Sequence, residues 1–117
     1  MGSVSGKTPL RSLDVIQDEH RYWIAHNFPD ESLYRAVFGM VEEMGELAHH
    51  LLKRAQGIRS SGVDHDAEIR DACADLVIFM MTVADNEGFN LLEVINEAWD
   101  EVKQRDWIKF PHDGRTR

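Results

Sequence analysis

Apolar residues recur at intervals of three and four residues along most of this 117-residue chain. That spacing places apolar side chains on one side of an α-helix, whereas a half-buried strand alternates apolar and polar residues. We find no such alternation in the sequence. The pattern therefore predicts an all-α protein, and the chain is long enough for one domain with a core of its own.

Capping and helix-breaking residues divide this pattern into four expected helices. Their approximate bounds are Ser12–Asn27, Asp30 or Ser32 to Gly57, Asp64 or Asp66 to Gly88, and Asn90–Trp107. The stretch from 58 to about 63 is the expected central loop. We predict a compact antiparallel four-helix bundle over residues 12–110. A disordered leader over 1–11 precedes it, and a tail over 111–117 that has nothing to bury follows it.

The same spacing predicts which side chains face the interior. The expected inward residues are Leu13, Ile16, His20, Trp23 and Ile24 in the first helix, and Leu33, Val37, Met40, Met44, Leu47 and Leu51 in the second. His20 is expected to be a hydrogen-bonded core residue, whereas His49 and His50 are expected on the helix surface. The run Leu76–Met81 is apolar on every side of its helix, which predicts burial on every side.

Composition excludes some partners and favours another. The net charge is −8 and the 13 Lys and Arg residues are scattered, so nucleic acid is not an expected partner. An acidic protein that handles polyphosphates needs a divalent cation between the like charges. Cys73 is the single cysteine, so no disulfide can form within the chain, which favours a cytoplasmic location. No apolar run is long enough to span a membrane, so no membrane partner is expected.

Acidic residues occupy positions where a helix bundle would bury them. Glu43 and Glu46 lie three residues apart and therefore share one face of the second helix. On the third helix Glu68, Asp71 and Asp75 fall within roughly 60° of one another. Asp75 immediately precedes the apolar run, where an uncompensated carboxylate would be costly. Inward carboxylates on two helices favour a site for Mg²⁺ or Mn²⁺, although acids near a helix start also fit a solvated face.

Two motifs carry a resemblance to a known family. The string Glu42-Glu43-Met-Gly-Glu46-Leu-Ala and the later string Asp75-Leu-Val-Ile-Phe resemble the MazG-like branch of the all-α nucleoside triphosphate pyrophosphohydrolases. Residues 14–26 look like the first helix of that family, and residues 99–107 look like the end of its last helix in some members. The resemblance covers nearly the whole helical domain and implies a MazG-like bundle that oligomerises through its helices.

The family pattern has four acids, in the order Glu-x-x-Glu and then Glu-x-x-Asp. This sequence matches three of them. Glu43 and Glu46 match the first pair, and Asp75 matches the last acid. The remaining glutamate is replaced by Ala72, so Asp71 or Glu68 would have to supply the missing oxygen. A second departure lies in the fourth helix, where the Lys and Asn of many relatives align with Ala98 and Val102.

The resemblance implies Mg²⁺-dependent hydrolysis of ribo- or deoxynucleoside triphosphates to monophosphate and pyrophosphate, with nucleotide-pool cleaning as one cellular task. The implied metal ligands are Glu43, Glu46, Asp71 and Asp75, and the implied catalytic residues are Glu43, Glu46 and Asp75. Glu46 or Glu42 would orient or deprotonate the attacking water. The implied substrate contacts are Trp23 and His26 for the base, with Lys53, Arg59, Lys103 and Arg105 for the phosphates.

Three further expectations accompany this interpretation. The missing glutamate at Ala72 favours an alternative, a degenerate non-catalytic module that binds nucleotide or a partner chain. Phosphoribosyl-ATP hydrolysis is another possible reaction on the same fold. Apolar residues on the second and fourth helices exceed what a lone bundle needs, which predicts a homo-oligomer, and the family resemblance implies a homodimer or homotetramer. The residues in question are Met40, Leu52, Trp99 and Trp107.

Overall fold

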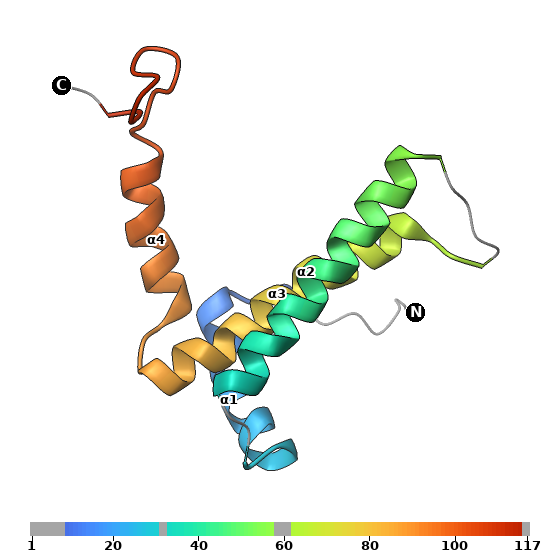
Figure 1. The fold of residues 1–117 in the computed structure, drawn as a ribbon. Helices are drawn as coiled ribbons and strands as arrows, with labels where there is room; N and C mark the ends of the chain where they lie inside the picture. Colours follow the sequence, from blue (N-terminus) through green and yellow to red (C-terminus); the bar gives the residue numbers. More distant parts are fainter. Residues whose placement is uncertain (1–8, 31–32, 58–61, 116–117) are drawn as a thin grey trace.

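The structure is a computed structural model that describes residues 9–30, 33–57 and 62–115. It contains four α-helices, and no strand occurs among the described residues (Figure 1). The helices are α1 (Leu13–Asn27), α2 (Leu33–Ala55), α3 (His65–Glu87) and α4 (Leu91–Val102). The prediction of an all-α chain with four helices is confirmed. None of the described helices is long and apolar enough to cross a membrane.

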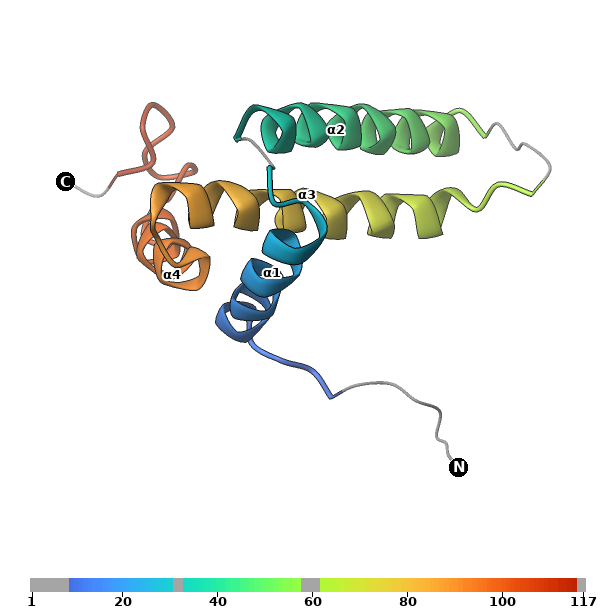
Figure 2. The same ribbon diagram turned by 90° about the horizontal axis from the view of Figure 1, so that it is seen from below.

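The helices form an open arrangement in the single chain. α2 and α3 lie side by side and antiparallel, as Figure 2 shows. The backbone of α2 lies against α3 alone, whereas α1 packs on both α3 and α4. α4 leaves the end of α3 as a separate arm, which points away from the α2–α3 pair (Figure 1). In place of the expected compact bundle, the single chain has one antiparallel pair, α2 and α3, with α1 and α4 packed near one end of α3.

The apolar core lies where α1, α3 and α4 meet. It consists of Met81, Ala84 and Leu91, which are all less than a tenth exposed. Partly buried residues of α1 and α3 pack against this cluster; they are Leu13, Ile16 and Val77. The expected burial of the run Leu76–Met81 holds only in part, because Ile78 and Met80 are 42% and 37% exposed in the single chain.

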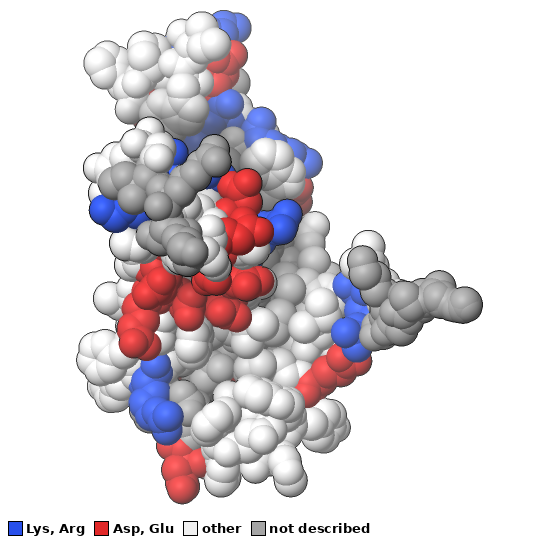
Figure 3. All heavy atoms as spheres, turned by 90° about the vertical axis from the view of Figure 1, so that its right-hand side faces the viewer, with Lys and Arg blue, Asp and Glu red and all other residues white. Residues whose placement is uncertain are grey.

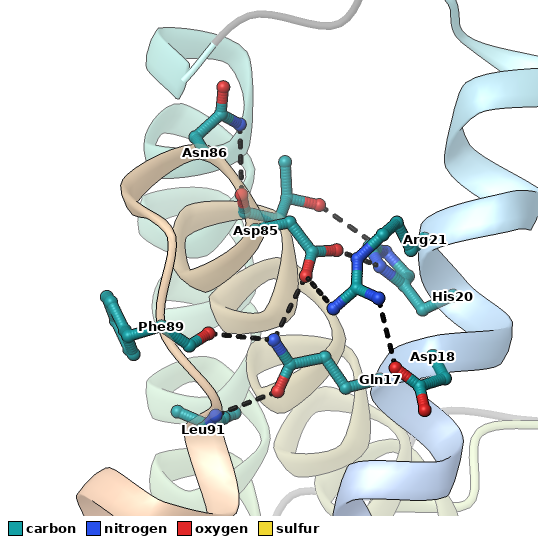
Figure 4. A network of polar contacts seen from close by, with 9 residues as sticks. Gln17, Asp18, His20, Arg21, Asp85, Asn86, Phe89 and Leu91 are labelled. Carbon is teal, nitrogen blue, oxygen red and sulfur yellow. Dashed lines mark hydrogen bonds and ion pairs between the residues drawn. The ribbon is translucent and has the colours of Figure 1, made fainter.

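A buried polar network joins the same three helices (Figure 4). Gln17 is fully buried, and its amide donates to Asp85 Oδ1 and to the carbonyl of Phe89, both at 3.0 Å. Its carbonyl accepts from the backbone N–H of Leu91 at 2.8 Å. His20 is also buried, between Asp85 Oδ2 and Thr82 Oγ1 at 3.4 Å each. The prediction of His20 as a hydrogen-bonded core residue is confirmed, whereas Gln17 was not expected inside.

The face of α2 that packs on α3 differs from the predicted one. Its buried residues are the small or polar Ala36, Gly39 and His50, and the expected inward residues Val37 and Met44 are 42% and 53% exposed. Small residues allow the two helices to approach closely, so the packing of α3 selects this face over the more apolar one. The expectation of a surface His50 is therefore wrong, and His49 is exposed as expected.

Gly39 is the position where this close approach is tightest. A Cβ atom built on Gly39 would lie 2.5 Å from Cζ of Phe79, whereas one built on Gly45 would meet nothing within 4 Å. Gly39→Ala gains about 1 kcal/mol of helix propensity but forces the Phe79 ring to move, at about 1–3 kcal/mol. We expect Gly39→Ala to lower the free energy of unfolding by up to about 2 kcal/mol in urea titrations. Gly45→Ala, the matched control, should raise it, and equal stabilisation by both would contradict this packing.

Local signals set most helix ends. The Asp64 side chain accepts from Ala67 N, the Asn90 side chain accepts from Glu93 N, and Gly88 ends α3 at φ +75°. These caps were predicted. The predicted end of the fourth helix at Trp107 is wrong, because α4 ends at Val102. Asp106 Oδ1 accepts from Ile108 N and Lys109 N, which offers the backbone a turn in place of a helix.

The segment after α4 closes on itself. Asp106 N donates to the carbonyl of Gly114, and Gly114 N donates to the carbonyl of Phe110. Gly114 is buried, with φ +69°, and a Cβ there would lie 2.8 Å from the Trp107 ring. The predicted boundary at 110/111 falls inside this loop. In the described part of the predicted tail Gly114 is buried, whereas Pro111, His112 and Arg115 are exposed. Of the predicted leader, residues 1–8 lie outside the described residues.

Candidate active site

Two adjacent cavities between the helices bring together the four predicted metal ligands and Trp23. The first, the acidic cavity, has a volume of about 430 Å³ and opens between α2 and α3. Six carboxylates and one small residue line it: Glu42, Glu43, Glu46, Glu68, Asp71, Ala72 and Asp75. On the face shown in Figure 3, acidic side chains gather in a patch with Lys and Arg side chains near it.

Helical spacing explains the composition of the acidic cavity. Residues three and four positions apart share a helix face, so one face of α2 presents Glu43 and Glu46 while one face of α3 presents Asp71 and Asp75. The antiparallel pairing of α2 and α3 turns these two faces toward each other. Ala72 is only 2% exposed and lies at the wall, with Asp71 and Glu68 beside it. Both proposed substitutes for the missing glutamate therefore border the same space.

The second cavity, the aromatic cavity, has a volume of about 380 Å³ and lies between α1, α2 and α3. Its lining residues are His20, Trp23, Ile24, Phe28, Arg35, Glu43, Asp75, Ile78, Phe79 and Thr82. The rings of Trp23 and Phe28 meet edge to face at 5.7 Å between centroids. The guanidinium carbon of Arg35 lies 6.0 Å from the centroid of the Phe28 ring. This cavity thus combines aromatic walls with one cationic side chain.

Glu43 and Asp75 border both cavities. Burial raises the pKa of the Glu43 carboxyl above its usual value, and the neighbouring Asp75 carboxylate raises it further. Glu46, Glu42 and Glu68 act in the same direction. Crowded carboxylates favour the protonated form of Glu43 because ionisation adds another negative charge in partly desolvated surroundings. A divalent cation placed in this cavity would relieve the same repulsion.

The acidic cavity has the donor chemistry of a hard cation site but not a preformed cage. No three Asp, Glu, His or Cys side chains in the described part of the chain converge closely enough to hold one ion. The lining groups offer carboxylate oxygens, the ligands that Mg²⁺ and Mn²⁺ prefer. The Glu46 side chain is 63% exposed, so its carboxylate has room to rotate toward the other lining groups. The donor set therefore fits such an ion.

The predicted substrate contacts divide into those near the cavities and those away from them. Trp23 lines the aromatic cavity, but His26 and Lys53 line neither cavity. Lys103 pairs with Asp100 at 3.0 Å, and Arg105 lines a separate hollow with Glu101, Gln104 and Arg115. Both lie beyond or at the end of α4, which makes no contact with α2. Arg59 lies outside the described residues.

Arg35 is the cavity residue that sequence reasoning missed. It lines the aromatic cavity together with Glu43 and Asp75. A signal for it exists in the sequence, because Arg35, Gly39 and Glu43 follow one another at four-residue intervals and so share a face of α2. Thr82 is the other addition, and helical spacing places it on the same face of α3 as Asp75 and Phe79. His20 was expected as a core residue only, yet it also borders this cavity.

Comparisons with known proteins give no independent assignment. Searches against family models, curated proteins and solved structures found no match to this chain. Function is therefore argued from the two cavities and from the motifs that line them.

Proposed function

We propose that this protein is a MazG-like nucleoside triphosphate pyrophosphohydrolase of the cytoplasm that uses Mg²⁺ or Mn²⁺. One observation carries the proposal: Glu43 and Asp75 border both an aromatic cavity and a cavity lined by six carboxylates. A nucleotide has chemical groups in a matching order, with a flat aromatic base at one end and a polyphosphate that binds divalent cations at the other.

The aromatic cavity would take the base. Trp23 and Phe28 offer ring faces or edges, and base–aromatic stacking contributes about 1–3 kcal/mol per base. A base held there directs its phosphates past Glu43 and Asp75 into the acidic cavity. Arg35 lines the aromatic cavity and not the acidic one, so it would lie beside the base, over the Phe28 ring.

The acidic cavity would take a metal-bound triphosphate. A chain of net charge −8 with six carboxylates in one cavity repels a polyphosphate unless a cation lies between them. Glu43, Glu46, Asp71 and Asp75 would hold the ion. When bound, Mg²⁺ supplies charge neutralisation at the phosphate oxygens. Glu46 or Glu42 would accept a proton from the attacking water as water adds across the α–β phosphoanhydride bond, releasing monophosphate and pyrophosphate.

The reaction is tested by pyrophosphate release from a panel of ribo- and deoxynucleoside triphosphates, with Mg²⁺ and with chelator. We expect Mg²⁺-dependent release whose rate differs among bases. The products should be nucleoside monophosphate and pyrophosphate in equal amounts. Release of orthophosphate instead would contradict cleavage of the α–β bond, and silence across the panel from folded protein would contradict the hydrolase proposal.

One observation favours a second candidate, a non-catalytic module that binds nucleotide. Ala72 occupies the wall of the acidic cavity, where the family pattern has a glutamate, and no preformed cation cage occurs in the described part of the chain. The two candidates are separated by the same panel. Tight nucleotide binding in calorimetry without turnover would support the module.

A homo-oligomer is the second part of the proposal. A standard interface buries about 800 Å² on each partner, and apolar side chains that are exposed in the single chain would supply such an area. Two apolar faces supply it: an α2 face of Tyr34, Val37, Phe38, Val41, Met44, Leu51 and Leu52, and an α4 face of Val94, Ile95, Trp99 and Val102.

The proposed homo-oligomer is tested by measuring the mass of the protein in light scattering at micromolar concentration. We expect a mass at least twice 13.5 kDa, because assembly would cover the apolar side chains that the two faces expose in the single chain. Val41→Lys, in the middle of the α2 face, should lower the mass. Glu87→Lys, on an exposed part of α3 outside both faces, serves as the control. A wild-type particle of 13.5 kDa would contradict the oligomer.

A further inference from the structure

A chain of three polar side chains connects the acidic cavity to the loop end of the α2–α3 pair. His50 Nε2 lies 3.5 Å from Glu46 Oε2, one helical turn earlier on α2. On the other side of the same ring, His50 Nδ1 lies 2.9 Å from Nδ1 of His65, the first residue of α3. The His50 side chain is 9% exposed, whereas that of Glu46 is 63% exposed. An exposed carboxylate of the cavity is thus tethered to a buried imidazole.

The contact with Glu46 favours one direction for this chain. A carboxylate attracts an N–H and repels a lone pair, so we assign a proton to His50 Nε2, which faces Glu46 at 3.5 Å. In this assignment His50 Nδ1 presents a lone pair to His65, and the 2.9 Å distance between the two nitrogens requires one proton between them. His65 Nδ1 then donates that proton. Each ring orients the next, from His65 through His50 to Glu46.

This arrangement matters because Glu46 is otherwise free to turn into solvent. A glutamate side chain loses up to about 2 kcal/mol of rotamer entropy when it is fixed in place. His50 is held by burial and by His65, so it can restrict Glu46 before any ligand arrives. From these contacts we infer that His50 and His65 are positioning residues that hold Glu46 toward the acidic cavity for a divalent cation. The inference rests on the proposed metal site, and to that extent on the proposed function.

The test is direct binding of Mn²⁺ to the full chain, followed by electron paramagnetic resonance, with thermal melting recorded in parallel. His50→Leu keeps the buried position apolar and removes both contacts. We expect it to raise the Mn²⁺ dissociation constant by about tenfold or more, the usual effect of removing an outer partner of a metal ligand. His49→Leu, on the adjacent exposed position, should change the constant less than twofold.

His65 supplies a second pair of variants that does not depend on a buried substitution. His65→Leu removes the donor to His50 and should weaken Mn²⁺ binding several-fold. His65→Gln retains an N–H donor and should recover most of that loss. A purely structural role would lower the melting temperature of both variants without this recovery in metal affinity.

The outcomes separate this inference from the hydrolase proposal. Wild-type Mn²⁺ affinity in folded His50→Leu, or equal affinities for His65→Leu and His65→Gln, would overturn the inference. Absence of Mn²⁺ binding by the wild-type chain would overturn it together with the metal site. Normal Mn²⁺ binding without pyrophosphate release would contradict only the hydrolase, and the positioning role of the two histidines would stand.

Discussion

Asp75→Ala is expected to reduce Mg²⁺-dependent pyrophosphate release by about 100-fold or more while leaving the protein folded. Asp75 is half-buried and borders both cavities, so its loss removes an expected metal ligand at the point where base and phosphates would meet. The same carboxylate raises the pKa of Glu43 by repulsion. Its removal should therefore leave the melting temperature in chelator unchanged or higher.

Asp66→Ala provides the control for this variant. Asp66 lies on the same helix, outside both cavities, and pairs with Arg54 on the exposed surface at 2.8 Å. Such surface pairs contribute about 0–1 kcal/mol, so activity should stay near that of wild type. Full turnover by Asp75→Ala would show that the site is assigned to the wrong residues. Loss of folding by Asp75→Ala would contradict the repulsion argument.

Glu43→Gln is expected to stabilise the protein in chelator at pH 7 and to weaken divalent-cation binding by at least about tenfold. The pKa of Glu43 is raised in the folded state, first by burial and then by Asp75, so the folded chain binds this proton more tightly than the unfolded chain. Its contribution to stability is present below the ordinary value of 4.5 and is lost as pH rises through the raised pKa. Glutamine carries no charge to repel.

Urea titrations at pH 4 and pH 7, with chelator and with Mg²⁺, check this prediction. In chelator, the gain from Glu43→Gln should be greater at pH 7 than at pH 4, because the raised pKa makes the repulsion decrease as pH falls. Mg²⁺ should stabilise the wild type more than the variant, because it relieves the repulsion among carboxylates. Glu97→Gln, on the exposed part of α4, serves as the control. A variant less stable than wild type at pH 7 in chelator would contradict the pKa shift.

Local sequence signals predicted the elements and much of the site for a physical reason. Helix ends depend on nearby residues, so Asp64, Gly88 and Asn90 could be identified without knowledge of the fold. The acidic cavity also follows from spacing within helices. Once Glu43 and Asp75 are placed on faces that must be inward, two antiparallel helices bring them to one cavity.

Features that depend on the choice between competing faces or partners were not predictable in this way. α2 has an apolar face and a face of small and polar residues, and only packing against α3 decides that Gly39 and His50 are buried. From its sequence position Gln17 resembles a polar surface residue. Its burial depends on hydrogen bonds to the backbone of Phe89 and Leu91, in the turn between α3 and α4. The end of α4 depends on Asp106, whose side chain competes with the helix for backbone N–H groups.

Gln17 has a consequence for assembly. Its amide bonds to both sides of the bend between α3 and α4, at Phe89 and Leu91, and so fixes the direction in which α4 leaves the core. α4 carries an apolar face, so in the proposed oligomer this direction would determine where a neighbouring subunit docks and at what spacing. The quaternary geometry would then depend on a joint that neither cavity includes. A change at this joint would rearrange the subunits while the residues that line the two cavities stayed the same.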